Sequence, residues 1–400
     1  MRFVRVNVQC MQGVRIETNF EGGNLGRVEQ TGPSHFRVGS KGDKDQDGRN
    51  RQANWYSFRV EGARPGEMLT IDVVDLPGEY NYRPNRGAIT KDTPPVISEN
   101  QVAWRHVDDV EYDANEPRLR LKLVPRAPVF WIAHVPLYTN RHLVALESEC
   151  RKHPGFSREV IGRTLGNRDM PLWTVADAAS GGPKQTIWLV FRQHSWEAGS
   201  SWVGEGAVRT LLGIDGAELR RNTIWKIFPM CDPDGVARGG VRFNSLGFDL
   251  NRNWDVEDPA RMPEITSQRN AIRKWLEQGR RVDLFFSLHN TETSEYLEGP
   301  PNPDAKTRSL AERFFEALRG TTFHPSRPLF YADTSTTPGM KGRMTVTQGL
   351  ARDFAIPGFL MEQRISFNEK LKRLPLPEDR LRFGRELVRA MWQVVHASRA

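Results

Sequence analysis

Apolar and polar residues alternate in short stretches through the first third of the chain. This alternation, seen at 55–60 (WYSFRV) and 119–123 (LRLKL), is typical of strands with one buried face. Two more short strands are predicted at 36–38 and 69–74, and turn-forming clusters separate these runs. Since no long segment has the 3.6-residue period of a helix, residues 1–135 are predicted to form a small antiparallel β-sandwich.

From residue 136 onward, apolar runs of strand length alternate with segments of helical spacing. Proline at position 263 followed by Glu264 suits the first turn of one such helix. Alternation of this kind predicts an α/β domain with a largely buried sheet over residues 136–400. The predicted strands are 186–191, 223–228, 282–288 and 358–361, and the predicted helices are 141–152, 205–212, 263–278, 306–318 and 377–397.

Composition is consistent with a folded, two-domain protein. A chain of 400 residues with 38% hydrophobic residues can bury the cores of one large or two ordinary domains. It has no run of about 18 apolar residues, so no membrane-spanning helix and no membrane partner are expected, and the N-terminus lacks the apolar segment of a secretory signal. Three cysteines, Cys10, Cys150 and Cys231, do not make a disulfide framework. A cytoplasmic protein is the simplest interpretation.

A charged loop is predicted at 41–51 in the first domain. The alternating aspartates Asp43, Asp45 and Asp47 hint at a calcium-binding loop, but no glutamate follows at the expected offset. We therefore do not expect an ion there.

The first candidate for catalytic chemistry follows the strand predicted at 186–191. His194 and Glu197 lie three residues apart just beyond it. Zinc binds imidazole nitrogen and carboxylate oxygen, and a catalytic zinc site commonly has three protein ligands and one open position. The pair offers two ligands, and a third has to come from elsewhere. On its own the pair is a weak signal, because most His-x-x-Glu matches are accidental.

Further polar motifs lie at or just beyond the ends of the other predicted strands. They include 232–236 (DPDGV), 242–247 (RFNSLG) and 249–254 (DLNRNW), together with His289 and Glu362 on two later strands. Open α/β sheets place their sites at the carboxyl ends of the strands. We therefore expect these side chains to meet at one edge of the sheet.

These motifs, in this order, resemble the zinc metallocarboxypeptidases and, within them, the cytosolic carboxypeptidase-like subgroup. The resemblance covers nearly the whole chain; in the first domain it rests on 20–25 (FEGGNL), 55–58 (WYSF) and 80–82 (YNY), and in the second it begins at 136–139 (PLYT). It implies a mixed-sheet catalytic domain with helices on both faces, preceded by a small all-β antiparallel sandwich. The implied activity is zinc-dependent hydrolysis of the C-terminal bond of peptides or proteins, or of a side-chain-linked tail.

The resemblance also implies roles for individual residues. His194, Glu197 and His289 match the ligands of one zinc ion, which can lower the pKa of a bound water to roughly 7. Glu362 matches the general base that takes a proton and returns it to the leaving amine. Asp249 matches the carboxylate that accepts the other ring N–H of His194.

Substrate recognition is implied for a second group of residues. Asn251 and Arg252 resemble the pair that holds the terminal carboxylate, which an arginine fork can bind through two hydrogen bonds. Arg242 matches the arginine that polarises the scissile carbonyl. Arg343 resembles a basic position of subgroup members that remove acidic residues, so a preference for glutamate or aspartate is a hypothesis.

The sequence also departs from the family pattern. Ser195 and Trp196 stand where the subgroup usually has Pro-Gly between the first two ligands, and the bulky Trp196 could narrow the substrate pocket. Ser287 replaces an aspartate two residues before the third ligand, and Asn290 follows that ligand in place of a small residue. These departures remove neither a ligand nor the base, so an active enzyme is still expected.

Three other readings stay open. A zinc amidohydrolase of the same fold, acting on N-acyl amino acids, uses the same ligand pattern, and a non-catalytic module could bind peptide tails. Nucleic-acid binding is a third, since the net charge is +8, but we favour solvated basic faces and expect no nucleic-acid partner. The basic residues considered for nucleic-acid binding are Arg118, Arg120, Lys122 and Arg126, and Arg269, Arg273, Lys274, Arg280 and Arg281.

The sequence makes no prediction of the oligomeric state.

Overall fold

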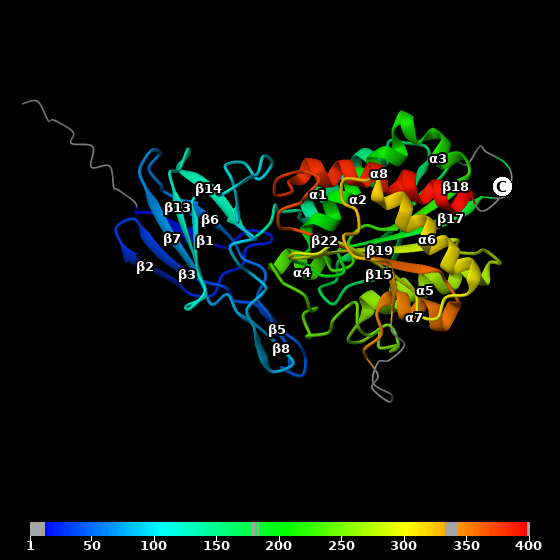
Figure 1. Ribbon diagram of the computed structural model, residues 1–400, viewed down its shortest axis with the longest axis horizontal. Helices are drawn as coiled ribbons and strands as arrows, with labels where there is room; N and C mark the ends of the chain where they lie inside the picture. Colours follow the sequence, from blue (N-terminus) through cyan, green and yellow to red (C-terminus); the bar gives the residue numbers. More distant parts are fainter. Residues whose placement is uncertain (1–12, 178–180, 182–183, 333–341, 398–400) are drawn as a thin grey trace, which may run out of the picture.

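The computed structural model describes residues 13–177, 181, 184–332 and 342–397, and the fold is given for these. A β-rich part, coloured blue to cyan, lies beside a larger part in which helices surround a sheet (Figure 1). The character of the chain changes between β14 (Val129–Ala133) and α1 (Asn140–Cys150). The domain limits 1–135 and 136–400 themselves stay a prediction.

The β-rich part contains two five-stranded sheets with a shared apolar core. Their strand orders are β1-β6-β14-β10-β11 and β12-β13-β7-β3-β2. Alternate residues of the strands, such as Phe58, Ile71, Leu121 and Phe130, are buried in that core. Besides β14, these strands are β1 (Arg15–Glu17), β2 (Val28–Gly32), β3 (His35–Gly39), β6 (Ser57–Glu61), β7 (Leu69–Val74), β10 (Val96–Ser98), β11 (Arg105–His106), β12 (Val110–Asp113) and β13 (Arg118–Leu123).

The predicted small sandwich is confirmed, with one difference in strand direction. Strands β3 and β7 pair in parallel, whereas the other described pairs in the two sheets are antiparallel. Parallel neighbours need a long crossover, and here the chain between β3 and β7 passes through β4, β5 and β6.

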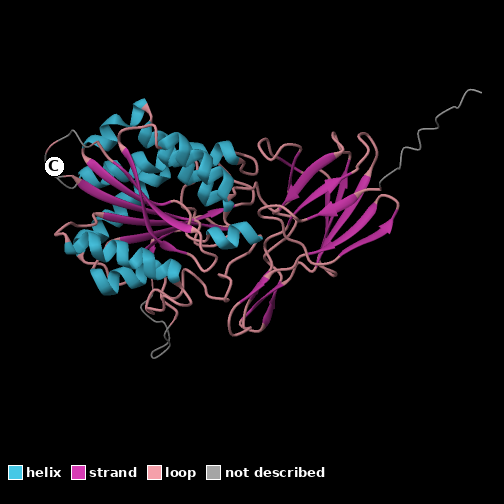
Figure 2. Ribbon diagram, turned by 180° about the vertical axis from the view of Figure 1, so that it is seen from behind, coloured by secondary structure: helices cyan, strands magenta, loops and turns pink. Residues whose placement is uncertain are grey.

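A small third sheet lies at the edge of the β-rich part that faces the larger part (Figures 1 and 2). It has the order β4-β5-β8-β9, and the predicted charged loop at 41–51 spans its first two strands. The strands are β4 (Asp43–Lys44), β5 (Arg51–Gln52), β8 (Gly78–Tyr80) and β9 (Arg83–Asn85).

The larger part is built on an eight-stranded mixed sheet with the order β15-β16-β18-β17-β19-β22-β20-β21. Its centre, from β18 through β22, is parallel, and β17 is buried along its whole length. The strands are β15 (Phe156–Arg163), β16 (Asp169–Val175), β17 (Gln185–Phe191), β18 (Thr223–Phe228), β19 (Leu284–Thr291), β20 (Tyr296–Gly299), β21 (Phe330–Tyr331) and β22 (Gly358–Arg364).

Helices cover both faces of this sheet, which confirms the predicted fold class (Figures 1 and 2). Helices α1, α2, α6 and α8 lie on one face, and α5 and α7 lie on the other. Beyond α1, the helices are α2 (Ala198–Leu212), α3 (Ala217–Arg221), α4 (Pro233–Arg238), α5 (Pro263–Glu277), α6 (Ala305–Arg319), α7 (Val346–Phe354) and α8 (Pro377–His396).

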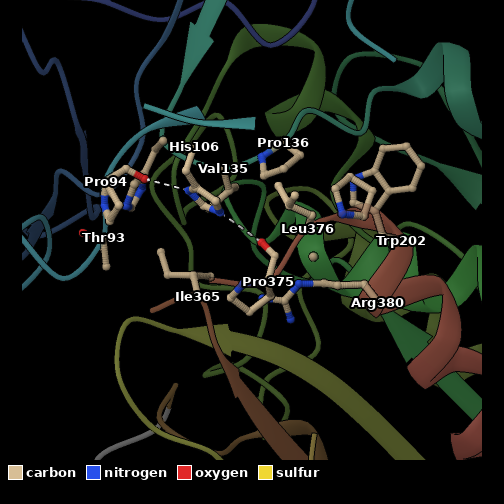
Figure 3. Close-up of a pocket in the computed structure, with 13 residues that line it drawn as sticks. Thr93, Pro94, His106, Val135, Pro136, Trp202, Ile365, Pro375, Leu376 and Arg380 are labelled. Carbon is tan, nitrogen blue, oxygen red and sulfur yellow. Dashed lines mark hydrogen bonds between the residues drawn. The ribbon is translucent and has the colours of Figure 1, made fainter. Parts of the chain in front are cut away.

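The two parts meet at a junction that contains a narrow cavity (Figure 3). His106 of the β-rich part lies within hydrogen-bonding distance of two carbonyl oxygens, at 3.4 Å from that of Pro94 and 3.3 Å from that of Pro375. Pro375 belongs to the larger part, so His106 links the two. A neutral imidazole has only one N–H to donate, so only one of the two contacts can be a hydrogen bond at any moment.

Three other expectations can be compared with the described residues. None of their helices is long and apolar enough to cross a membrane. Cys150 and Cys231 are buried with free thiols, and Cys10 lies outside the described residues. Many of the basic side chains considered for nucleic-acid binding pair with carboxylates: Arg120 with Asp72, Arg269 with Asp353, Arg273 with Glu257 and Lys274 with Glu159.

Candidate metal centre

The candidate metal ligands meet at the carboxyl edge of the central parallel strands. His194 and Glu197 lie in the turn after β17, and Glu197 is the residue that precedes α2. His289 lies on β19 directly beside Glu362 of β22 in the parallel register. The sequence predicted these side chains at strand ends, and the sheet order makes the three strands neighbours.

The three candidate ligands form one compact cluster. The Nδ1 atom of His194 lies 2.6 Å from Oε1 of Glu197, and the Nδ1 atom of His289 lies 3.0 Å from Oε2 of the same carboxylate. One ligand atom from each residue lies within 4.8 Å of the others, the only such group of three or more potential ligands found among the described residues. The three side chains are 2%, 2% and 0% exposed.

These donors fit a zinc ion. Two imidazole nitrogens and one carboxylate are a common ligand set of catalytic zinc sites. Oε2 of Glu197 and Nδ1 of His289 are buried and lie 3.0 Å apart, but they make no hydrogen bond to each other or to another described group, and buried polar atoms seldom stay unsatisfied. A cation between them would satisfy both atoms.

The charges in the cluster favour an ionised Glu197. Burial acts to raise its pKa, but the two neighbouring imidazoles outweigh burial, and the pKa lies below its usual value. Burial lowers the pKa of His289, which favours the neutral imidazole that a metal requires.

The far side of each imidazole is held by a hydrogen-bond partner. The Nε2 atom of His194 lies 3.1 Å from Oδ1 of Asp249. The Nε2 atom of His289 lies 2.9 Å from the hydroxyl of Ser287, which in turn donates to Oε1 of Gln193 over 2.9 Å. With the proton on Nε2, both rings turn Nδ1 toward Glu197. Partners of this kind fix the tautomer and orientation of a ligating histidine.

Ser287 and Gln193 therefore take the place of the carboxylate that the family pattern led us to expect beside the third ligand. From the sequence, Ser287 was expected to leave the third ligand without its carboxylate partner, and Gln193 was not among the predicted site residues. The available indication for Gln193 was its position next to His194, where a polar residue follows an apolar strand.

Asp249 links the metal ligands to Arg242. Its Oδ2 atom accepts a hydrogen bond from Nε of Arg242 over 2.7 Å, and its Oδ1 atom accepts one from the backbone N–H of Asn251 over 2.8 Å. Burial acts to raise the pKa of Asp249, but Arg242 and His194 outweigh burial and hold the pKa well below its usual value. The carboxylate is thus ionised beside His194.

Glu362 lies on β22 directly beside the candidate ligand His289. Its Oε2 atom is buried without a hydrogen-bond partner, while the side chain as a whole is partly exposed. Burial and the nearby charge of Glu197 raise its pKa well above the usual value. A raised pKa makes a carboxylate a stronger base, as general acid–base catalysis by a glutamate requires.

Three of the four candidate substrate-binding residues line the same cavity as Asp249. Asn251 is buried, and its Oδ1 atom accepts the backbone N–H of Val346 over 2.8 Å. Arg252 donates from Nη1 to the backbone carbonyl of Asn251 over 2.9 Å. Arg252, Arg242 and Arg343 line one cavity of about 160 Å³. The structure thus brings the predicted arginines together, whereas the amide oxygen of Asn251 already has a partner.

The turn that replaces Pro-Gly is held by a buried arginine. Nε of Arg192 donates to the carbonyl of Ser195 over 2.9 Å, and the N–H of Trp196 donates to the carbonyl of Val241 over 2.9 Å. Arg192 itself has φ = 61°, which is uncommon for a residue with a side chain. Arg192 was not among the predicted site residues, although its charge directly follows an apolar strand in the sequence.

Two family models match the chain. Residues 16–134 match the cytosolic carboxypeptidase N-terminal domain, and residues 144–356 match the zinc carboxypeptidase family. The second match includes the three candidate ligands and ends before Glu362.

Individual proteins show the same relationship. An uncharacterized protein of Zymomonas mobilis is 25% identical over 96% of this chain and 97% of its own length. Cytosolic carboxypeptidase 6 of Caenorhabditis elegans is 28% identical over 72% of this chain, which spans 65% of that protein. Among solved structures, a metallo-carboxypeptidase from Burkholderia cenocepacia has the same fold, with a TM-score of 0.81 and 22% identity over 97% of this chain and all of the other.

Proposed function

The chain belongs to the zinc carboxypeptidase family and carries the N-terminal domain of the cytosolic carboxypeptidases, and from this premise we propose that it removes C-terminal residues from peptides, proteins or side-chain-linked tails with one zinc ion per chain. The observation that carries the proposal is the convergence of His194, Glu197 and His289 directly beside Glu362. The curated relatives include proteins named as cytosolic, which supports a cytoplasmic location.

His194 and His289 would hold the zinc through Nδ1, and Glu197 through its carboxylate. When bound, zinc acts as a Lewis acid that activates water and polarises a carbonyl group. The Asp249 and Ser287 hydrogen bonds keep both imidazoles aimed at that position.

Glu362 acts as the general base and then as the general acid. Its carboxylate takes a proton from the attacking water and returns it to the nitrogen of the leaving amine as the C–N bond breaks. The raised pKa of Glu362 suits this double role, since it makes the carboxylate a stronger base than an ordinary glutamate.

Three arginines and one asparagine select and orient the substrate. Arg252 binds the terminal carboxylate through its planar fork, and the Nδ2 group of Asn251 contributes a further donor. Arg242, held by Asp249, stabilises the negative charge that develops on the scissile carbonyl oxygen. Arg343 lies at the same cavity and supports a preference for acidic C-terminal residues.

A peptide panel tests the proposal. Zinc-loaded wild type and Glu362→Gln are incubated with peptides whose last residue is acidic, basic, aliphatic or aromatic, and with N-acyl amino acids, and products are identified by mass spectrometry. Loss of single C-terminal residues with wild type alone is the expected result, fastest for acidic ends. Deacylation without trimming would instead identify an amidohydrolase, and an absence of any turnover would favour a binding module.

A further inference from the structure

The cavity beside the candidate metal centre has walls from both domains. Arg242, Arg252 and Arg343 come from the catalytic domain. Gln46, Arg49 and Gln52 come from the small sheet of the first domain, in or next to the loop between β4 and β5. A substrate that fills the cavity therefore touches the first domain.

Three of the arginines at this cavity have no carboxylate partner among the described residues. Arg242 pairs with Asp249, but no ion pair is found for Arg49, Arg252 or Arg343. Nε of Arg49 is in addition buried without a hydrogen-bond partner. Gathering unpaired guanidinium groups costs free energy through mutual repulsion and lost hydration. An anionic ligand would offset that cost.

The backbone around Arg49 is fixed by the aspartates of the charged loop. Oδ1 of Asp45 accepts the N–H groups of Arg49, over 2.7 Å, and of Asn50, over 3.2 Å. The carbonyl of Arg49 accepts the N–H of Tyr82 over 2.8 Å. The hydrogen bonds of Asp45 thus stabilise a turn, and this turn fixes the backbone position of Arg49.

The same loop is fastened to the segment that carries the catalytic candidates. Oδ2 of Asp43 accepts the N–H groups of Val241, over 2.7 Å, and of Arg242, over 3.2 Å. The N–H of Gln46 donates to the carbonyl of Gly247 over 3.0 Å. At Gly247 φ is +86° and an added Cβ would lie 2.5 Å from the nitrogen of Gln46, so glycine permits this close approach. Arg49 is therefore held at a fixed place relative to Arg242.

We propose that Arg49 is a specificity-determining residue of the first domain, which binds an acidic side chain in the last two residues of the substrate. The inference rests on the proposed function, in which Arg252 takes the terminal carboxylate. Arg49 and Arg343 then remain for side-chain carboxylates, and a guanidinium group binds a carboxylate through two hydrogen bonds. In this arrangement the first domain supplies part of the substrate site.

Binding to a non-cleaving enzyme tests this proposal apart from activity. Arg49→Gln is made in the zinc-loaded Glu362→Gln background, and Kd is measured by calorimetry for four peptides that end in Glu-Glu, Gln-Glu, Glu-Gln or Gln-Gln. We expect Arg49→Gln to raise Kd for the Glu-Glu peptide by about tenfold, as for loss of a charged hydrogen bond, and to leave the Gln-Gln peptide within about twofold. The two mixed peptides identify which carboxylate Arg49 contacts.

Lys44→Gln is the matched control, because it removes one positive charge from an exposed position of the same small sheet. Three results would each overturn the proposal. Arg49→Gln could weaken the binding of all four peptides equally, or it could leave the binding of all four unchanged. The third is that Lys44→Gln weakens Glu-Glu binding as much as Arg49→Gln does. Arg49→Glu adds a reversal test, since it should favour a Lys-Lys ending over Glu-Glu. If the wild type binds these peptides but trims none, the proposed function fails while the role of Arg49 can still be decided.

Discussion

The imidazole of His134 stacks on the indole of Trp196, with ring centres 6.0 Å apart and planes 16° from parallel. On its other face His134 stacks on Tyr56 at 5.6 Å and 23°. Tyr56 and His134 belong to the first domain, and Trp196 lies between the candidate ligands His194 and Glu197. Trp196 is buried in this stack at 3% exposure. The stack therefore packs the turn that carries the candidate ligands against the first domain.

His134→Ala is expected to weaken zinc binding, because the ligand turn loses its aromatic support. An aromatic pair contributes roughly 0.5–1.5 kcal/mol beyond its buried area, so the zinc Kd should rise by up to about tenfold. Competition with a chromophoric chelator measures it. His106→Ala serves as the control, since His106 also links the domains but contacts Pro94 and Pro375. Equal zinc affinity in wild type and His134→Ala would show that the stack has no influence on the metal.

Glu362→Gln should keep its zinc and lose hydrolysis. The amide has nearly the same shape but cannot accept the proton, and general acid–base catalysis contributes about 10²–10⁴-fold. Metal analysis and steady-state rates on a cleaved peptide are the two measurements. A rate within about tenfold of wild type would remove Glu362 from the role of base.

Asp249→Asn is expected to weaken zinc binding by about 10- to 100-fold, as is typical when a partner of a ligating histidine is changed. The substitution removes the charge that holds His194 and leaves Arg242 without its carboxylate. Asp234→Asn is a matched control, because Asp234 is also a buried aspartate paired with an arginine, Arg168, away from the ligands. A similar loss of zinc affinity in both variants would contradict a specific role for Asp249.

Glu264 should make the protein less stable as the pH rises. Its carboxylate oxygens are buried without hydrogen-bond partners, and burial, with the nearby charge of Asp232 acting in the same direction, raises its pKa to about 7. A raised carboxyl pKa favours the protonated folded state, so the stabilisation is present below the unfolded pKa of 4.5 and is lost as the pH rises through 7. The loss is on the order of 3 kcal/mol.

Glu264→Gln should remove that dependence. Urea midpoints of wild type and variant at pH 5 and pH 8 give the comparison, in which the other titrating groups largely cancel. We expect the variant to gain stability relative to wild type at pH 8. The same difference between the two proteins at both pH values would refute the assignment.

The sequence predicted the parts of the fold whose patterns are strong. The strand predicted at 223–228 is β18 without change, and the helix predicted from 263 begins at Pro263. The helix predicted at 205–212 instead begins at Ala198, because the small residues from Gly199 to Ser201 are buried all round and show no amphipathic period. Strand β15 was missed because most of it is exposed or half-buried at the edge of the sheet.

The candidate site could likewise be predicted only in part from the sequence. The strand-end positions of His194, Glu197, His289 and Glu362 predicted that these side chains meet at one edge of the sheet, and the family resemblance supplied their roles. The sequence could not predict partners that come together only in the folded chain: Gln193 bonded to Ser287, and Arg49 at the same cavity as Arg252. No local pattern connects a loop of the first domain to an arginine some two hundred positions later.

A matched pair of peptides, identical except for a free or amidated C-terminus, gives the most direct test of the central claim. Both are incubated with zinc-loaded wild type, with Arg252→Gln and with Glu362→Gln, and released residues are followed by mass spectrometry. We expect loss of the last residue from the free acid alone, a strongly reduced rate in Arg252→Gln and no release in Glu362→Gln. Equal trimming of the amidated peptide, or trimming by Glu362→Gln, would contradict a carboxypeptidase centred on these residues.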